Sequence, residues 1–269
     1  MSSFDCTARS GPKRVILVKR ISQWEACGRD ASEGNAATAK QRSSVLLTAL
    51  NALERLQEGN RRFATGVRGL DSLLLHSRRP GLVTGQEPIA VVLGCSDSRV
   101  PVEIVFDQGL GDLFVIRVGG NIVAPSQIGS VEFAAEQFGT RLVVVLGHTR
   151  CGVIDACLRE LQQPAEKQSR NLRPIVNRVR PSVEGLLATD LRHDHEALAR
   201  HAVRANVRVS ANGLRHGSEL LERLIQDDRL LVVGAEYSLE TGIVEFFDGV
   251  PGSSPSGSTV PRAPSESMY

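Results

Sequence analysis

Two stretches of the chain decide the fold. Residues 89–99 read Ile-Ala-Val-Val-Leu-Gly-Cys-Ser-Asp-Ser-Arg, and residues 142–152 read Leu-Val-Val-Val-Leu-Gly-His-Thr-Arg-Cys-Gly. Each begins with a short, nearly continuous apolar run, which is typical of a strand covered on both faces. Between them, Ile128–Phe138 has the apolar spacing of a helix. Strand, crossover helix and strand in this order predict a parallel sheet.

Further candidate elements extend this sheet. Leu113–Val118 is another apolar run of strand length, and Leu230–Ala235 and Ile243–Phe247 are two closing strands separated by a turn at Thr241-Gly242. Helices are predicted over residues 45–63, 153–161, 174–180, 196–209 and 218–226. The expected fold class is therefore α/β, a single domain with a central, mostly parallel β-sheet flanked by helices.

The predicted domain spans residues 45–248, between two segments of different composition. Residues 1–44 hold Gly, Ser, Ala and scattered charges, and predict a poorly ordered extension. Their one compact apolar run, Val15–Val18, is too short for a secretory signal, which needs roughly 7–15 apolar residues. Residues 249–269 are rich in Gly, Ser and Pro, which predicts a disordered tail.

Composition excludes several classes of protein. The chain has 269 residues, 41% of them hydrophobic, and no apolar run approaches the roughly 20 residues that a bilayer demands. A formal net charge of +2 and 4% aromatic residues provide neither a basic surface nor stacking rings for nucleic acid. Five cysteines are too few for a disulfide scaffold and indicate metal or redox chemistry in a reducing compartment. We therefore expect a cytoplasmic protein.

Reactive residues follow directly on two of the predicted strands. Cys95 lies just beyond the strand 89–93, and His148 and Cys151 lie just beyond the strand 142–146. In an open parallel sheet, ligands bind outside the carboxyl ends of strands where the strand order reverses, so the two strand ends can converge on one site. Two thiolates and one imidazole suit the tetrahedral preference of zinc, and three protein ligands leave a fourth position open.

The other cysteines and two of the histidines are read as having no such role. A single Cys after a core strand is most often a small buried hydrophobe, and a lone His usually makes a structural hydrogen bond; the combination of the two motifs is what favours a metal site. Cys6 and Cys27 lie in the extension, and Cys157 falls on a predicted helix. His193 and His195, in a polar connection, are expected to be solvated.

The sequence resembles the β-class carbonic anhydrases, whose zinc signature is C-x-D-x-R followed by H-x-x-C. The similarity runs from about residue 45 to residue 247 and includes three further motifs: Glu58-Gly59-Asn60-Arg61-Arg62-Phe63, Gly109-Leu110-Gly111-Asp112-Leu113-Phe114-Val115 and Gly234-Ala235-Glu236-Tyr237. The resemblance implies a lyase that hydrates carbon dioxide reversibly to bicarbonate and a proton.

The resemblance also implies roles for single residues. It makes Cys95, His148 and Cys151 ligands of Zn²⁺, and Asp97 and Arg99 a catalytic hydrogen-bonded pair beside the metal. Asp97 is in addition a possible fourth ligand in a closed state. Gln86, nine residues before Cys95, matches the family glutamine whose amide contacts bicarbonate.

Assembly and two alternative functions stay open at this point. The resemblance implies a homodimer, or a homotetramer made of two dimers. The helix over residues 45–63 is far from the first sheet strand along the chain, so we expect it to lie across a neighbouring subunit rather than to close its own core. The alternatives are a zinc hydrolase of the same fold acting on CS2 or COS, and a non-catalytic zinc-binding interaction protein.

Overall fold

The structure, a computed structural model, describes residues 34–67, 79–163 and 169–252, with side chains over residues 48–67, 81–163 and 169–252. By its internal contacts the chain divides into two units, Met1–Ala39 and Lys40–Tyr269, and everything below concerns the second. The predicted extension and tail, residues 1–44 and 249–269, lie for the most part outside the described residues, so these limits stay predictions.

A five-stranded sheet forms the centre of the second unit. Its strands are β1 (Ala90–Gly94), β2 (Leu113–Arg117), β3 (Leu142–His148), β4 (Leu231–Tyr237) and β5 (Val244–Asp248). Their spatial order is β2-β1-β3-β4-β5. The first four run parallel, and β5 is antiparallel to β4. The predicted α/β fold with a mostly parallel sheet is confirmed.

Helices connect these strands much as the apolar spacing predicts. They are α1 (Gly34–Ala64), α4 (Val102–Val105), α5 (Pro125–Gln137), α6 (Gly152–Gln162), α7 (Arg173–Leu187), α8 (His195–His216) and α9 (Glu219–Gln226). Short 3-10 turns span η1 (Arg79–Val83), η2 (Gly119–Asn121) and η3 (Asp190–His193). The helix α4 and the three turns are too short to give a periodic signal, and α1 begins well before residue 45.

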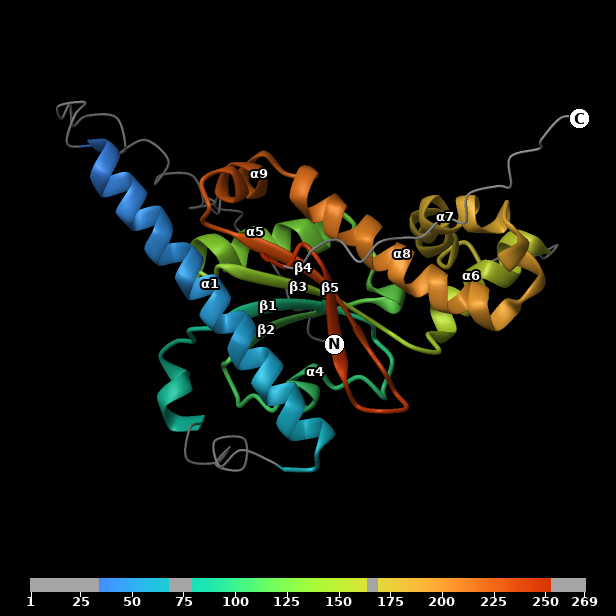
Figure 1. The fold of residues 1–269 in the computed structure, drawn as a ribbon, viewed down its shortest axis with the longest axis horizontal. Helices are drawn as coiled ribbons and strands as arrows, with labels where there is room; N and C mark the ends of the chain where they lie inside the picture. The colour runs from blue at the N-terminus through green and yellow to red at the C-terminus, as the bar shows by residue number, and fades with distance from the viewer. Residues whose placement is uncertain (1–33, 68–78, 164–168, 253–269) are drawn as a thin grey trace, which may run out of the picture. The chain divides into compact units, whose positions relative to one another are not determined.

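Helices cover both faces of the sheet, as Figure 1 shows. On one face, α1 and α4 pack against alternate strand residues such as Val92 and Val144. On the other face, α5, α8 and α9 pack against the strand residues that alternate with these, such as Val91 and Val143. The strands β1 and β3 are buried along their whole length, which explains why they read as continuous apolar runs.

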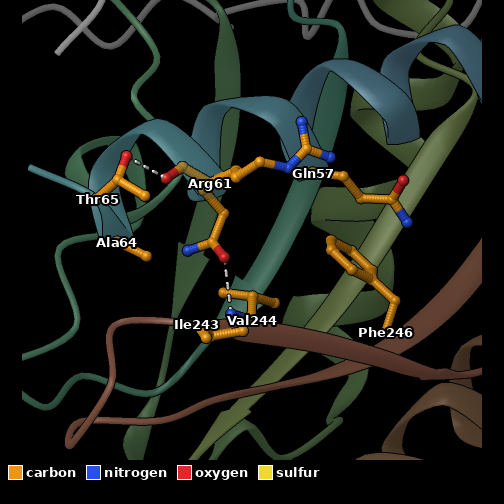
Figure 2. Close-up of a pocket in the computed structure, with 8 residues that line it drawn as sticks. Gln57, Arg61, Ala64, Thr65, Ile243, Val244 and Phe246 are labelled. Carbon is orange, nitrogen blue, oxygen red and sulfur yellow. Dashed lines mark hydrogen bonds between the residues drawn. The ribbon is translucent and has the colours of Figure 1, made fainter. Parts of the chain in front are cut away.

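The expectation that α1 lies across a neighbouring subunit is wrong for the described part of this helix. Leu53 and Leu56 are buried against the chain's own sheet. The buried Asn60 fastens α1 further, because its amide donates to the carbonyls of Val105 and Gly242 and accepts from the N–H of Val244. A hollow of about 380 Å³ remains between the end of α1 and β5 (Figure 2).

A third apolar cluster lies beyond the carboxyl ends of β1 and β3. It joins α6 and α7, which lie side by side in Figure 1, to the first half of α8, and it contains Cys95 and Cys151. Because β1 pairs with β2 on one side and with β3 on the other, the strand order reverses here, and the ends of β1 and β3 form the switch point of the sheet. Within the described residues, none of the helices is both long and apolar enough to cross a membrane.

Candidate metal centre

Three predicted ligands meet at the switch point. Cys95 follows β1, His148 is the last residue of β3, and Cys151 immediately precedes α6. The two Sγ atoms lie 3.9 Å apart, and the ligand atoms of all three side chains lie within 4.8 Å of one another. All three residues are buried. The structure therefore brings together the three side chains that the two sequence motifs singled out.

The histidine presents an unused nitrogen to this cluster. Its Nδ1 lies 2.9 Å from the carbonyl oxygen of Thr149, so Nδ1 carries the proton and Nε2 carries the lone pair. Nε2 is buried and has no hydrogen-bond partner among the described residues. Leaving such an atom unpaired is costly, and metal-ligating histidines commonly donate their other N–H to a carbonyl in this way. The imidazole is thus oriented as a metal ligand.

The two thiols share one hydrogen bond. Their mutual hydrogen bond, together with the N–H of Gly120 at 3.4 Å from Cys95 Sγ, lowers the pKa of Cys95 to about 4. The same hydrogen bond and burial raise the pKa of Cys151 far above its usual range. The chain alone therefore favours a single thiolate, whereas a bound cation deprotonates coordinating thiols outright. This donor set fits a soft or borderline metal ion.

The pair of Asp97 and Arg99 lies beside the cluster. Arg99 donates from Nε to Asp97 Oδ1 at 2.9 Å and from Nη2 to Oδ2 at 2.7 Å. These hydrogen bonds hold the pKa of Asp97 well below its usual range and raise that of Arg99. The Oδ2 atom of Asp97 lies 3.9 Å from Nε2 of His148. An ionised carboxylate is therefore fixed next to the unpaired nitrogen.

Three further residues support the loops around the cluster. Arg117 donates to the carbonyl oxygens of Cys95 and Asp97 at 3.0 and 2.5 Å. Asn206 on α8 donates to the carbonyl of Gly120 at 2.8 Å, and Gly120 in turn donates to Cys95. Each of these hydrogen bonds joins residues that are far apart in sequence, so no local sequence motif predicts the contact.

Gln86 does not join the cluster of its own chain. It precedes β1, whereas Cys95 follows that strand, so the two residues lie at opposite ends of β1. Gln86 instead lines a separate hollow of about 500 Å³ with Leu82, Leu110 and Asp112. The expectation that Gln86 contacts a substrate at the metal centre is therefore not met within a single copy of the chain.

The residues expected to have no role are placed as follows. Cys157 is buried within the apolar cluster around α6 and α7, and burial raises its pKa to about 11. His193 accepts a hydrogen bond from Arg192. His195 is half exposed, as expected, but it also pairs with Asp155 at 2.6 Å. Both His195 and Asp155 line a hollow of about 520 Å³ that has Cys151 in its wall.

The fold and the site together define a class of protein: an α/β protein with a Cys-His-Cys cluster that could hold a metal ion, at the switch point of a mostly parallel sheet. A sequence model described as "Carbonic anhydrase" matches residues 90–244. The chain belongs to the β-class carbonic anhydrase family.

Individual relatives agree with this assignment. The chain is 38% identical over 207 residues to Carbonic anhydrase 2 of Mycobacterium tuberculosis, covering 74% of this chain and 93% of that protein. It is 38% identical to a carbonic anhydrase of Mycolicibacterium smegmatis, covering 72% and 91%. Among solved structures, the β-carbonic anhydrase CafA of Aspergillus fumigatus has a TM-score of 0.59 at 27% identity, covering 66% of this chain and 84% of that one. Such relatives support carbonic anhydrase as the enzyme class.

Proposed function

We propose that this chain catalyses the reversible hydration of carbon dioxide to bicarbonate and a proton, as a lyase that depends on Zn²⁺ held by Cys95, His148 and Cys151. The observation that carries the proposal is the buried, unpaired Nε2 of His148, within 4.8 Å of two thiols and beside the carboxylate of Asp97. Family membership supports the reaction, and the softness of the donor set supports the metal.

The residues around the centre have distinct roles in this reaction. Zinc in such a site supplies Lewis acidity, which lowers the pKa of a coordinated water. Asp97 accepts a hydrogen bond from the attacking water and aims an oxygen lone pair at carbon dioxide. The two-point contact from Arg99 keeps the carboxylate of Asp97 ionised and oriented. The 3.9 Å between Asp97 Oδ2 and His148 Nε2 supports the further proposal that Asp97 can close the site as a fourth ligand.

The metal assignment is tested by zinc content. We expect one zinc per chain in the wild type and little zinc in Cys95→Ser or Cys151→Ser. Cys157→Ala is a matched control, because Cys157 is also a buried thiol near α6 but lies outside the cluster, and it keeps full zinc. Full zinc occupancy in both Ser variants would refute the ligand assignment.

The reaction is tested by stopped-flow hydration of carbon dioxide, with CS2 and COS hydrolysis measured in parallel. Asp97→Asn removes the carboxylate while keeping its shape, so we expect it to bind zinc and to turn over slowly at every pH. Turnover of CS2 or COS without hydration of carbon dioxide would favour the hydrolase alternative. Undiminished hydration in Asp97→Asn would show that the carboxylate neither orients the water nor closes the site.

Assembly follows from the position of Gln86. If the amide of Gln86 contacts bicarbonate, it must come from a second copy, because within one chain it lies at the far end of β1 from Cys95. The hollow around Gln86 is bordered by half-exposed apolar surface at Leu110, which suits a contact between subunits. We therefore propose a homodimer, or a homotetramer built from two dimers, in which each subunit completes the site of its neighbour.

Mixing two inactive variants tests this arrangement. Gln86→Ala lacks the amide and Cys95→Ser lacks the metal, but a hybrid dimer of the two has one site with both. We expect activity to return on mixing and re-equilibration, and light scattering to show no active monomer. If the mixture is as inactive as the two separate variants, or if the wild-type protein is active as a monomer, the proposal that each subunit completes its neighbour's site is refuted.

A further inference from the structure

A carboxylate from the far end of the chain contacts the turn that carries two of the metal ligands. Glu240 lies in the connection between β4 and β5. Its Oε2 accepts a hydrogen bond from the hydroxyl of Thr149 at 2.7 Å, and its Oε1 accepts one from Nε of Arg150 at 2.6 Å. Thr149 and Arg150 are the two residues between the ligands His148 and Cys151. One side chain therefore binds both residues of this short connection.

The connection has a backbone conformation that needs such support. Arg150 has a φ of 53°, in the left-handed region that non-glycine residues adopt reluctantly. The end of β4 and the turn that follows it add further contacts: Thr149 N–H donates to the carbonyl of Tyr237 at 2.9 Å, and the hydroxyl of Thr149 accepts from the N–H of Leu239 at 3.0 Å. The hydroxyl of Thr149 is thus used both as donor and as acceptor, and its orientation is determined.

The same connection reaches the other ligand loop. The carbonyl oxygen of Arg150 accepts a hydrogen bond from Nη2 of Arg99 at 3.1 Å, and Arg99 also holds the carboxylate of Asp97. A continuous series of contacts therefore runs from Glu240 through Arg150 and Arg99 to Asp97. The conformation of the Thr149-Arg150 connection affects both the ligands that flank it and the carboxylate opposite them.

Global stabilisation of the fold does not account for Glu240. The side chains of Arg150 and Glu240 are 73% and 44% exposed, and ion pairs in such surroundings contribute little to folding. The hydrogen bonds from Thr149 and from a backbone N–H, together with that from Arg150, hold the pKa of Glu240 at about 2. Its carboxylate is therefore ionised throughout the physiological range and can accept both hydrogen bonds at once.

We propose that Glu240 is a positioning residue of the metal centre: it fixes the Thr149-Arg150 connection so that His148 and Cys151 face Cys95 and so that Arg99 holds Asp97. This inference rests on the metal site of the proposed function. Mutating a group that hydrogen-bonds a metal ligand typically weakens metal affinity by about 10- to 100-fold. Glu240 should therefore affect both the affinity for the metal and the rate at which the metal is released.

The test compares Glu240→Ala and Glu240→Gln with a matched control, Glu245→Ala. Glu245 is also a carboxylate of the β4–β5 hairpin paired with an arginine, here Arg204, and its side chain is 62% exposed, but it does not touch the ligand turn. The full-length, zinc-loaded proteins are mixed with excess chelator, and zinc release is followed with a colorimetric indicator. The melting temperature is measured with and without zinc.

Glu240 contacts the residues between two ligands rather than a ligand itself, so we expect the lower end of this range: zinc release about 10-fold faster in Glu240→Ala than in wild type and control. The rise in melting temperature on zinc loading should shrink, while the zinc-free protein melts as the control does. Glu240→Gln, which retains one acceptor oxygen, should fall between. Thr149→Val should release zinc faster too, and the double variant with Glu240→Ala should lose less than the sum of the two single effects, because both substitutions remove the hydrogen bond between Thr149 and Glu240.

Two results would overturn the inference. One is release at the wild-type rate in both Glu240 variants. The other is an equal loss of melting temperature with and without zinc, which indicates a merely structural role. Failure of the proposed function looks different: a wild-type protein that holds zinc but does not hydrate carbon dioxide refutes that function alone, and the comparison of release rates still decides the role of Glu240.

Discussion

A methyl group added at Gly120 tests how closely the loop behind Cys95 is packed. Gly120 lies in η2 with a φ of 71°, its N–H donates to Cys95 Sγ at 3.4 Å, and its carbonyl accepts from Asn206. A Cβ built on Gly120 lies 3.1 Å from Cγ1 of Val153 on α6. Gly120→Ala therefore perturbs both the backbone conformation and a contact with the helix that follows Cys151.

The two contributions can be separated with Gly66. Gly66 has a φ of 75°, and a Cβ there meets no atom within 4 Å, so Gly66→Ala measures the left-handed conformation alone, about 1–2 kcal/mol. The 3.1 Å contact at Gly120 requires Val153 to move by a few tenths of an ångström, and overpacking of this kind adds about 1–3 kcal/mol. We therefore expect Gly120→Ala to lose about 2–5 kcal/mol, clearly more than Gly66→Ala.

Urea denaturation followed by circular dichroism measures both variants, in the presence of chelator so that metal binding does not contribute. In a Val153→Ala background the extra loss at Gly120 should disappear, leaving a cost similar to that at Gly66. Equal losses for Gly120→Ala and Gly66→Ala in the wild-type background would refute the argument from close packing. So would an extra loss at Gly120 that persists without the Val153 side chain.

Three further predictions concern groups away from the ligands. Burial raises the pKa of the Glu236 carboxyl, so this group favours folding below its unfolded pKa, near 4.3, and the contribution is lost as the pH rises through the folded pKa. As the pH rises from about 4.5 to about 7, the melting temperature of Glu236→Gln should therefore increase relative to that of wild type. A relative decrease would contradict the direction of the pKa shift. Cys157, whose pKa burial raises to about 11, should escape iodoacetamide at pH 8 in the folded protein, as read by peptide mass spectrometry; rapid labelling would show that the site is accessible. Leu56 is fully buried, so Leu56→Ala should cost about 2–5 kcal/mol in urea denaturation. Val67→Ala, at a position 60% exposed, should stay within about 0.5 kcal/mol, and similar losses in the two variants would contradict the placement of α1 on its own sheet.

Much of the sheet could be predicted because burial on both faces leaves a simple signal. The strand expected at residues 89–93 is found at Ala90–Gly94, and the cluster of Cys95, His148 and Cys151 could be predicted because reactive side chains follow such strands directly. The apolar stripe of α1 was harder to interpret. Its spacing shows that one face is buried but not against which surface, so the sequence alone did not reveal that Leu56 packs on its own sheet.

The supporting residues had no signal in the sequence. Glu240 follows His148 by more than ninety residues, and it reaches Thr149 only because β3 and β4 pair in a register that places His148 opposite Tyr237. Periodicity within a strand does not determine its register against another strand. The place of Gln86 in the fold had no signal for a related reason: its spacing from Cys95 is a distance along the chain, and because β1 lies between the two residues, they are at opposite ends of that strand.

The position of the ligands at the switch point has a consequence for the order of folding. The loops after β1 and β3 become neighbours only once these strands have paired, across a connection that contains β2 and α5. Closing such a long loop costs entropy before it yields any contacts. Small zinc domains fold around their ion, whereas this chain must assemble its sheet before the three ligands exist as a group. In a cell that is short of the metal, we therefore expect this protein to accumulate in a folded, metal-free form that resists proteases and can bind the metal later.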